Sequence, residues 1–323
     1  MKVLVTGAGG FIGSHLAEYL VSLGHSVRAF VRYNSSSSSG WLDTSPLAGE
    51  MEIIRGDIRD FDSVKSAVSD TEAVFHLAAL IGIPYSYVSP LAYIRTNMEG
   101  SYNILQAARE CDVRRVVHTS TREIYGTAQR VPIDETHPVN PQSPYAASKS
   151  AADQLALSYY RSFALPVTVV RPFNTYGPRQ SARAIIPTIA SQLAFGQKVL
   201  RLGNLTPTRD LNFVEDTVRG FVQVGLCDAA VGEVCNLANG KEISIGALAS
   251  AIADRSGVVP TIEQENQRLR PEKSEVERLC GDASKAKSLC GWEPSVSLSE
   301  GLDRTIRWIK EHRDYFKADT YRV

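Results

Sequence analysis

The chain has 323 residues, in which 35 basic side chains balance 35 acidic ones and 43% of all residues are hydrophobic. A chain of this length can bury a large core, and it exceeds the roughly 100–150 residues of a typical single domain. The net charge of zero argues against nucleic-acid and anionic-membrane partners, because both require a basic surface. No hydrophobic run approaches the roughly 20 residues that cross a bilayer, so no membrane association is expected.

The N-terminus and the cysteines indicate an intracellular setting. Lys2–Thr6 leads directly into a glycine turn, which is unlike a secretion signal. The five cysteines form no C-x-x-C pair, a pattern typical of free thiols in a reducing cytoplasm rather than of disulfides or a zinc site. We therefore expect a cytoplasmic protein without a bound metal.

Strand-like and helical segments alternate through the first half of the chain. The expected strands are rich in Val, Ile, Phe and Thr and lie at Val3–Thr6, Ser26–Val31, Glu52–Arg55, Ala73–Ala79, Arg115–Ser120 and Val167–Arg171. Most are hydrophobic throughout, as parallel strands covered on both faces are. Amphipathic helices are expected between them at Ile12–Leu23, Phe61–Val68, Tyr93–Glu110 and Pro144–Phe163. This alternation predicts an α/β fold with a doubly wound parallel sheet.

After Pro178 the pattern loosens, and a smaller, mostly helical lobe is expected. Helices are predicted at Ile185–Phe195, Val214–Leu226, Ile245–Ser256 and Gly301–Phe316, with one strand at Glu233–Leu237. We divide the chain into residues 1–178 and 179–323, with segments around 211–240 returning to the main sheet. The serine run Ser35–Ser39 is expected to form a flexible surface loop.

A glycine-rich turn follows the first strand and opens the first helix. Gly7, Gly10 and Gly13 occupy its fixed positions, with Phe11 and Ile12 between the last two. Glycines let a backbone turn tightly and approach a pyrophosphate, whose charge then lies on the amides and the positive end of the helix. In this strand–turn–helix context the motif predicts a dinucleotide-binding site.

The identity of the dinucleotide is left open by the residues at the ends of later strands. Asp57 follows the third strand and offers a carboxylate to the adenine amine, and the small residues of Leu77–Ala79 allow the cofactor to lie close. The second strand ends in Arg32, where an NAD site usually has an acidic residue. A guanidinium suits a 2′-phosphate, so NAD and NADP both remain candidates.

Tyr145 and Lys149 lie four residues apart, which places both on one face of a helix. A free tyrosine has a pKa of about 10, too high for a base at neutral pH. A neighbouring ammonium and a nicotinium charge both lower that pKa by favouring the phenolate. Together with Thr119–Thr121 at the end of the fifth strand, the pair predicts proton transfer from a sugar hydroxyl.

The glycine turn, the set Thr121, Tyr145 and Lys149, and the run Arg171–Pro178 resemble the extended short-chain dehydrogenase/reductase family over essentially the whole chain. That family has a Rossmann-like fold and comprises nucleotide-sugar epimerases, dehydratases and decarboxylases. Four shorter runs resemble its N-acetylglucosamine-nucleotide 4,6-dehydratases of legionaminic acid biosynthesis, namely residues 125–129, 142–145, 179–183 and 274–278. The motif and the resemblance together give the expected cofactor-binding residues as Gly7, Gly10, Phe11, Ile12, Gly13, Arg32, Asp57, Ile58, Leu77, Ala78, Ala79, Asn97, Thr119, Tyr145, Lys149 and Pro172.

The resemblance implies a redox cycle in which the cofactor stays tightly bound and is recycled. Tyr145, assisted by Thr121, would deprotonate the sugar 4-hydroxyl while the C4 hydride passes to the nicotinamide. In the family's dehydratases a Thr-Asp-Glu run follows, in which glutamate removes the C5 proton and aspartate protonates the departing C6 oxygen, before hydride returns to C6. Thr121, Glu123, Tyr145 and Lys149 are accordingly the expected catalytic residues.

This chain departs from that pattern because Arg122 stands where the dehydratases have aspartate. A guanidinium stays protonated in proteins and cannot act as the acid. Three explanations remain. Glu123 moves both the C5 proton and the proton for the departing C6 oxygen, or water or another side chain supplies the second proton, or the reaction is not a dehydration. A UDP-glucuronate decarboxylase is the first alternative, because a substrate carboxylate would bind Arg122, and a nucleotide-sugar 4-epimerase is the second. A non-catalytic dinucleotide-binding protein is disfavoured, since it has no need of Tyr145 with Lys149.

The expected substrate is a nucleotide-diphosphate sugar of the UDP- or GDP-N-acetylglucosamine type. By resemblance its binding residues are Asn174, Arg209 and Arg270, with Arg209 and Arg270 on the two phosphates, and Arg122 is added because its guanidinium suits a substrate carboxylate. Family members commonly dimerise through a four-helix bundle. Tyr93–Glu110 and Pro144–Phe163 are therefore expected to pair with their copies in a second subunit.

Overall fold

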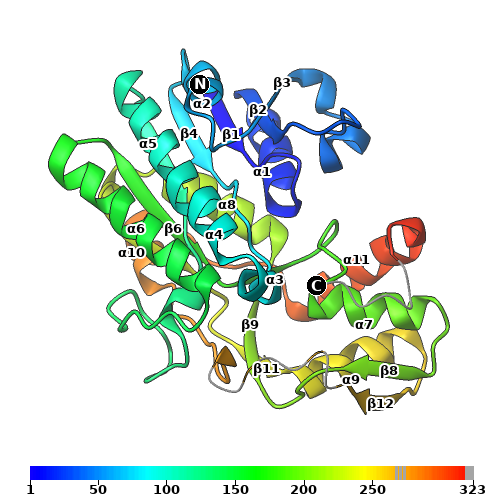
Figure 1. Ribbon diagram of the computed structural model, residues 1–323. Helices are drawn as coiled ribbons and strands as arrows, with labels where there is room; N and C mark the ends of the chain where they lie inside the picture. The colour runs from blue at the N-terminus through cyan, green and yellow to red at the C-terminus, as the bar shows by residue number, and fades with distance from the viewer. Residues whose placement is uncertain (266–267, 269–270, 272–273, 317–323) are drawn as a thin grey trace.

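A seven-stranded parallel sheet forms the centre of the computed structural model, which describes residues 1–265, 268, 271 and 274–316 (Figure 1). Across the sheet the strands are β10 (Val234–Leu237), β6 (Val167–Pro172), β5 (Arg115–Thr119), β4 (Ala73–His76), β1 (Lys2–Thr6), β2 (Ser26–Arg32) and β3 (Met51–Gly56). All neighbouring pairs are parallel. The chain starts in the middle, moves outward through β2 and β3, and then crosses back to β4. The predicted doubly wound α/β fold is confirmed.

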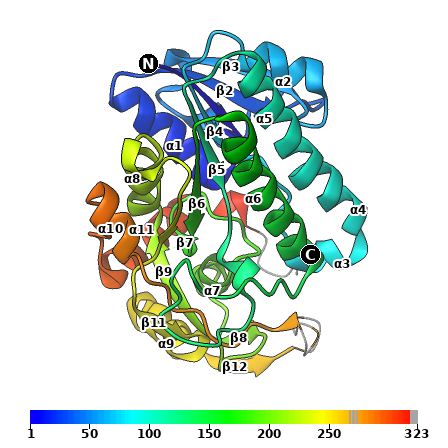
Figure 2. The same cartoon turned by 90° about the vertical axis from the view of Figure 1, so that its left-hand side faces the viewer.

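Both faces of the sheet are covered by helices, which explains its uniformly hydrophobic strands. Side chains alternate across a strand, so Val3 and Val5 contact one helical layer while Leu4 contacts the other. The first layer contains α1 (Phe11–Ser22) and α8 (Val214–Gly225), and the second contains α2 (Phe61–Val68), α5 (Gly100–Glu110) and α6 (Pro144–Phe163). Figure 2 shows the second layer along one side of the sheet, with α5 and α6 next to each other.

The smaller lobe combines helices with two small sheets. Its helices are α7 (Ile185–Ala194), α9 (Ile245–Ser256) and α11 (Leu298–Glu311), while α10 (Ser284–Cys290) packs against β10 of the main sheet. One small sheet contains β11 (Glu242–Ser244), β9 (Thr208–Phe213) and β7 (Asn174–Tyr176), and the other pairs β12 (Thr261–Gln264) with β8 (Val199–Leu202). The sequence predicts none of these five strands, because most span only three or four residues and leave no clear period.

Short helices make most of the remaining connections. They are η1 (Gly40–Thr44), η2 (Ala48–Glu50), α3 (Ile83–Val88), α4 (Pro90–Tyr93), η4 (Arg122–Tyr125), η5 (Asp228–Ala230) and η8 (Arg313–Tyr315). Between α4 and α5 the chain passes through a π-helical turn, η3 (Ile94–Glu99). The chain is therefore helical over the whole of the predicted Tyr93–Glu110, and the sequence does not predict the π-helical turn within it.

Side chains hold the serine run, for which the sequence predicts a flexible loop. Asp43 accepts hydrogen bonds from the Ser38 hydroxyl and the Ser39 amide, and Asn34 accepts one from the Ser38 amide. The Arg55 guanidinium donates to the Ser39 hydroxyl at 3.0 Å. Residues 34–43 therefore have a defined conformation beside the end of β3.

No helix within the described ranges has the length and hydrophobicity needed to cross a membrane. All five cysteines are unpaired. In the part of the chain that the structure describes, no three His, Cys, Asp or Glu side chains gather in a way that would hold a metal ion.

Candidate active site

The glycine turn lies at the carboxyl end of β1, where the strand order reverses, and it is too tightly packed for any other residue. A Cβ on Gly13 would lie 2.1 Å from the Gly7 carbonyl oxygen, and one on Gly7, whose φ is +72°, would lie 2.9 Å from the Ala78 nitrogen. Gly10 caps α1 without a side chain, so the first amides of the helix are left for an anion. Phe11 and Ile12 supply two of those amides. The turn fits the pyrophosphate of a dinucleotide.

Replacing Gly13 with alanine is expected to abolish tight dinucleotide binding, because the new methyl group must displace the Gly7 carbonyl and open the turn. Calorimetric titration of apoprotein with NAD would measure the loss, which we expect to exceed about tenfold in Kd. Gly49→Ala is the matched control, since a Cβ there meets no atom within 4 Å. Equal affinity in the two variants would contradict this account.

Other predicted cofactor residues surround the same edge of the sheet. The Thr6 hydroxyl accepts hydrogen bonds from the amides of Leu77 and Ala78, each at 3.1 Å, and so fixes the end of β4 against the glycine turn. Ala79 continues this segment, Ile58 is buried, and Pro172 ends β6. Arg32 is exposed at the end of β2.

Asp57 and Arg32 lie close enough to interact electrostatically. The pKa of Asp57 is lowered mainly by the hydrogen bond from Arg59, and Arg32 adds a smaller effect in the same direction. The Arg59 Nε–Asp57 Oδ1 distance is 2.9 Å. The carboxylate predicted to meet adenine is therefore ionised and already has one cationic partner.

The four predicted catalytic side chains are all buried. Thr121 and Glu123 follow the carboxyl end of β5, and Tyr145 and Lys149 lie near the start of α6. Tyr145 is 8% exposed, Thr121 3%, Glu123 4% and Lys149 3%. The Thr121 side chain lies close enough to the Tyr145 phenol to lower its pKa through a hydrogen bond. Lys149 donates its ammonium hydrogen to the Thr119 carbonyl oxygen. The Thr119 hydroxyl is buried and has no hydrogen-bond partner among the described residues.

Burial raises the pKa of Tyr145 to about 12 in the ligand-free protein, while the Thr121 hydrogen bond and the Arg122 charge oppose this rise. The same burial lowers the pKa of Lys149 to about 8. The phenol therefore stays protonated at neutral pH and cannot accept a proton until further positive charge lowers its pKa. A nicotinium ring beside it would supply such a charge.

Arg122 is part of the site rather than a solvated surface residue. Its guanidinium lies 2.8 Å from the Glu123 carboxylate, and its buried Nε has no hydrogen-bond partner within the described ranges. Its charge also acts on Asp210 on β9, whose pKa burial raises to about 6. Arg122 therefore lies near enough to both Glu123 and Asp210 for its charge to act on each, and its role in substrate binding stays a prediction.

The π-helical turn positions Asn97 beside the catalytic helix. The Asn97 amide exchanges hydrogen bonds with the backbone of Leu80 at 2.8 and 3.0 Å and donates to the Ser148 hydroxyl at 3.0 Å. Ser148 in turn donates to the Tyr145 carbonyl oxygen. Asn97 thus links the segment that follows β4 to η3 and α6, and its amide has bonds of its own in the ligand-free protein.

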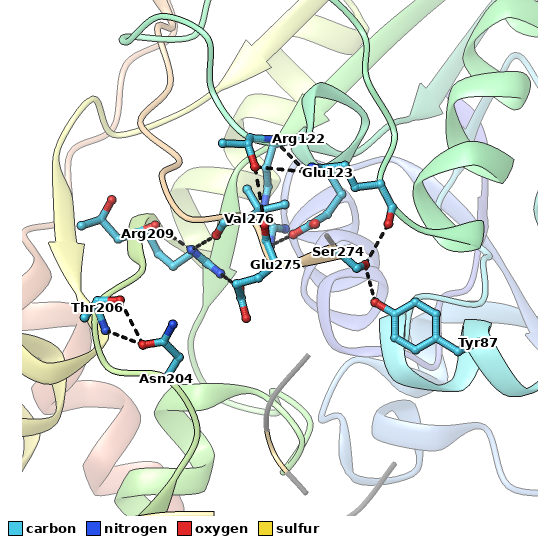
Figure 3. A network of polar contacts seen from close by, with 12 residues as sticks. Tyr87, Arg122, Glu123, Asn204, Thr206, Arg209, Ser274, Glu275 and Val276 are labelled. Carbon is cyan, nitrogen blue, oxygen red and sulfur yellow. Dashed lines mark hydrogen bonds and ion pairs between the residues drawn. The ribbon is translucent and has the colours of Figure 1, made fainter. Parts of the chain in front are cut away.

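On the substrate side, Arg209 is held by the segment that crosses between the lobes. Figure 3 shows its guanidinium directed at the Val276 carbonyl oxygen, 2.9 Å away, and at the Glu275 carboxylate, 3.3 Å away. Tyr87 and the Gln142 backbone fix the same segment through the Ser274 hydroxyl. The sequence does not predict these contacts, and they place Glu275 where it competes with an anionic ligand for Arg209.

The other two predicted substrate residues have different outcomes. Asn174 lies at the start of β7, and its side-chain oxygen is buried without a hydrogen-bond partner in the described part of the chain. It is therefore available to a ligand. Arg270, predicted to bind a phosphate, lies outside the described residues.

A buried polar cluster behind Lys149 was missed by the sequence reasoning. Asp153, Arg171 and His118 are each less than 5% exposed and contact one another. The available signal was the spacing, because Asp153 follows Lys149 by four residues and shares its face of α6. The site therefore contains a phenol, an ammonium, a carboxylate–guanidinium pair and a dinucleotide cradle, which together suit proton and hydride transfer.

Comparison with known proteins agrees with this arrangement. The family model of GDP-mannose 4,6 dehydratase matches residues 4–305. A UDP-glucose 4-epimerase from Mycolicibacterium smegmatis is 34% identical over 315 residues, covering 96% of this chain and 99% of the relative. A dTDP-glucose 4,6-dehydratase from Streptomyces antibioticus is 32% identical over 321 residues, covering 98% and 95%. The solved structure of the dTDP-glucose 4,6-dehydratase DesIV from Streptomyces venezuelae, with NAD bound, superposes with a TM-score of 0.90 at 30% identity, covering 98% of this chain and 99% of that one.

Proposed function

Because the chain belongs to the extended short-chain dehydrogenase/reductase family of NAD-dependent nucleotide-sugar dehydratases and epimerases, we propose that it is a nucleotide-sugar 4,6-dehydratase. The observation that carries the proposal is the burial of Glu123 beside Thr121 and Tyr145, close enough for its charge to act on the phenol. A 4-epimerase needs the phenol and the threonine but has no evident use for a buried carboxylate beside them. A dehydratase requires that carboxylate as its base.

The first step uses Tyr145, Thr121 and Lys149. Tyr145 accepts the proton of the sugar 4-hydroxyl. The Thr121 hydroxyl, hydrogen-bonded to the phenol, holds the phenol oxygen and the sugar oxygen close together, and the charge of Lys149 stabilises the phenolate. A bound nicotinamide would take the C4 hydride and return it at the end of the cycle. Gly7, Gly13 and the amides of α1 would hold its pyrophosphate.

The second step uses Glu123 and Arg122. The new 4-ketone acidifies the C5 proton, which Glu123 accepts, and the resulting carboxylic acid passes this proton to the C6 hydroxyl as the C6–O bond breaks. Arg122 holds the carboxylate in place at 2.8 Å and stabilises the negative charge that develops on the leaving oxygen. Water is lost, a bound nicotinamide would return its hydride to C6, C5 takes a proton from solvent, and Tyr145 releases to solvent the proton that it took from the 4-hydroxyl. One carboxylate thus replaces the aspartate–glutamate pair.

We place a UDP- or GDP-N-acetylglucosamine in the crevice. Arg209 suits its diphosphate once Glu275 is displaced, and Asn174 offers an unengaged amide oxygen. The four runs that resemble the N-acetylglucosamine-nucleotide 4,6-dehydratases, at residues 125–129, 142–145, 179–183 and 274–278, support an amino sugar as substrate. The test is to incubate the enzyme with both nucleotide sugars and follow the products by mass spectrometry. We expect a product lighter by one water and no net consumption of cofactor, and formation of only a 4-epimer or a pentose would contradict the proposal.

We assign the recycled cofactor as NAD, on the likeness to the NAD-bound DesIV structure. Arg32 lies exposed and close to the Asp57 carboxylate, so a 2′-phosphate would have to share it with that anion. Mass spectrometry of the cofactor released from denatured protein tests the assignment. NAD is expected, and NADP would overturn it. The five unpaired cysteines fit a reducing compartment, and we place the enzyme in the cytoplasm.

Two alternative reactions have specific support. The 34% identity to a UDP-glucose 4-epimerase favours a 4-epimerase, and Arg122 favours a UDP-glucuronate decarboxylase, because its guanidinium suits a substrate carboxylate. The product screen separates the three reactions. Only dehydration depends on Glu123 as base.

We further propose a homodimer through a four-helix bundle formed by α5 and α6 with their copies. Hydrophobic side chains spaced along one face of α4, η3 and α5 are exposed by 41–56%, namely Leu91, Ile94, Met98 and Tyr102. The double variant Met98→Glu/Tyr102→Glu is expected to sediment as a monomer, because four like charges would meet in the interface. Val259→Glu, at a residue 99% exposed, is the control and should leave the dimer intact. A wild-type monomer would refute the proposal.

A further inference from the structure

Asp153 is a buried acid that the proposed steps leave without a role. It is 1% exposed and lies on α6, one helical turn after Lys149. The Ser120 hydroxyl donates to its carboxylate, the Arg171 guanidinium lies 3.1 Å away, and the His118 Nε2 lies 3.2 Å away. Burial disfavours its ionisation, but the His118 hydrogen bond and the Arg171 charge outweigh burial and lower the pKa of Asp153 to about 2. Asp153 is therefore an anion at all working pH values.

Lys149 needs such an anion nearby. It is 3% exposed, and its ammonium donates to a neutral carbonyl oxygen rather than to a carboxylate. Burial lowers the pKa of Lys149 from 10.5 to about 8, and the charge of Asp153 acts in the opposite direction. Without Asp153 the ammonium would lose its proton at a still lower pH.

Among the described ionisable groups around Lys149 and Tyr145, Asp153 is the one that supplies negative charge to Lys149. They are His76 on β4, His118 on β5, Arg171 on β6, and Arg122 and Glu123 on η4 beside Tyr145. Burial lowers the pKa of both histidines, so both are neutral near pH 7. Arg171 is cationic and adds no negative charge. Glu123 is already paired with Arg122.

We propose that Asp153 is a positioning residue that keeps Lys149 charged, and that it thereby sets the alkaline limit of the pH range in which Tyr145 accepts the sugar proton. The second half of this statement rests on the proposed function. The first half concerns two buried side chains of the folded protein and is independent of any substrate.

The test begins with Asp153→Asn, which keeps the size of the side chain and removes its charge. In single-turnover measurements of C4 oxidation, followed by reduced-cofactor absorbance, the alkaline limb should move to lower pH by about one to two units, which is within the range that one neighbouring charge produces. Asp153→Glu keeps the charge and should restore the limb. Ser120→Ala removes one hydrogen bond of Asp153 but no charge, and should leave the limb where it is.

A second readout needs no substrate. A lysine whose pKa is lowered by folding makes the protein more stable as pH rises from the folded pKa to the unfolded one. The Lys149-dependent part of the unfolding free energy, taken as holoenzyme minus Lys149→Met, should therefore rise from about pH 8. In the Asp153→Asn background the rise should begin at lower pH.

The two readouts separate the possible failures. If no nucleotide sugar is turned over, the proposed function fails while the stability measurement still tests Asp153 and Lys149. If both the alkaline limb and the stability onset stay unchanged in Asp153→Asn, the inference is wrong. Should this variant not fold, Asp153→Ser removes the charge and keeps a small hydrogen-bonding group, and it should shift the limb and the onset in the same direction; an unchanged onset there would overturn the inference equally.

Discussion

Replacing Tyr145 with phenylalanine is expected to lower the rate of C4 oxidation by about 10²–10⁴-fold, the usual worth of a positioned acid–base group. The phenol is the group that Thr121 hydrogen-bonds in the buried crevice. Phenylalanine keeps the ring, and with it the edge-on packing against Tyr93 at a centroid distance of 6.2 Å. The loss should therefore appear in the chemical step and leave the fold and cofactor content unchanged.

Single-turnover measurement of reduced-cofactor absorbance, with cofactor content determined on the same sample, would check this result. Tyr93→Phe is the matched control, because the Tyr93 hydroxyl donates to the Gly82 carbonyl oxygen and has no part in the proposed chemistry. Its oxidation rate should stay near that of the wild type. Equal rates in the two variants would remove Tyr145 from the mechanism.

Three of the helices with side-chain caps were predicted from the sequence with correct bounds, whereas α11, capped by Ser297, spans Leu298–Glu311 instead of the predicted Gly301–Phe316. The helices α2, α6 and α9 coincide with the predicted ranges, and each is preceded by a residue whose side chain accepts a backbone amide hydrogen, namely Asp60, Ser143 and Ser244. Such caps are local and are visible in the sequence. The strands of the main sheet were equally accessible because each is a short hydrophobic run.

The misplaced elements depend on contacts that are distant in sequence. Nothing in residues 94–99 marks a π-helical turn, and its Asn97 is held by Leu80 and Ser148, which lie 17 and 51 residues away. The predicted strand Ala73–Ala79 ends at His76, after which the Ala78 amide bonds to the Thr6 hydroxyl, while the Leu77 amide bonds to both the hydroxyl and the backbone oxygen of Thr6. These bonds form only once the sheet is assembled.

The candidate site likewise contains residues that local motifs predict and contacts that only the folded chain shows. Gly7, Tyr145 and Lys149 were found because the spacing of each motif fixes its geometry. The engagement of Arg209 by Glu275 joins residues 66 positions apart, and the contact between Asp153 and Arg171 joins α6 to β6. No local pattern encodes either pair, so the charge balance of the site was accessible only from the folded chain.

Replacing Glu123 with glutamine separates dehydration from the reactions that share its first step. Glutamine preserves the size of the side chain and a hydrogen bond to Arg122, but its amide cannot accept the C5 proton. Water loss is expected to fall by about 10²–10⁴-fold, while C4 oxidation continues and reduced cofactor accumulates. Mass spectrometry of the products and cofactor absorbance, recorded together, would show this divergence.

Glu275→Gln provides the matched control because it makes the same change in a glutamate that also faces an arginine in this crevice, at 3.3 Å from Arg209. Its contact is with the predicted diphosphate ligand, so the variant should change KM and leave the ratio of water loss to C4 oxidation as in the wild type. An unchanged ratio in Glu123→Gln would mean that Glu123 is not the base. A 4-epimerase would give that result, since its catalysis ends at the ketone and the returning hydride. The behaviour of this carboxylate, held by Arg122 where the family's dehydratases have an acid, therefore decides which reaction the shared scaffold performs.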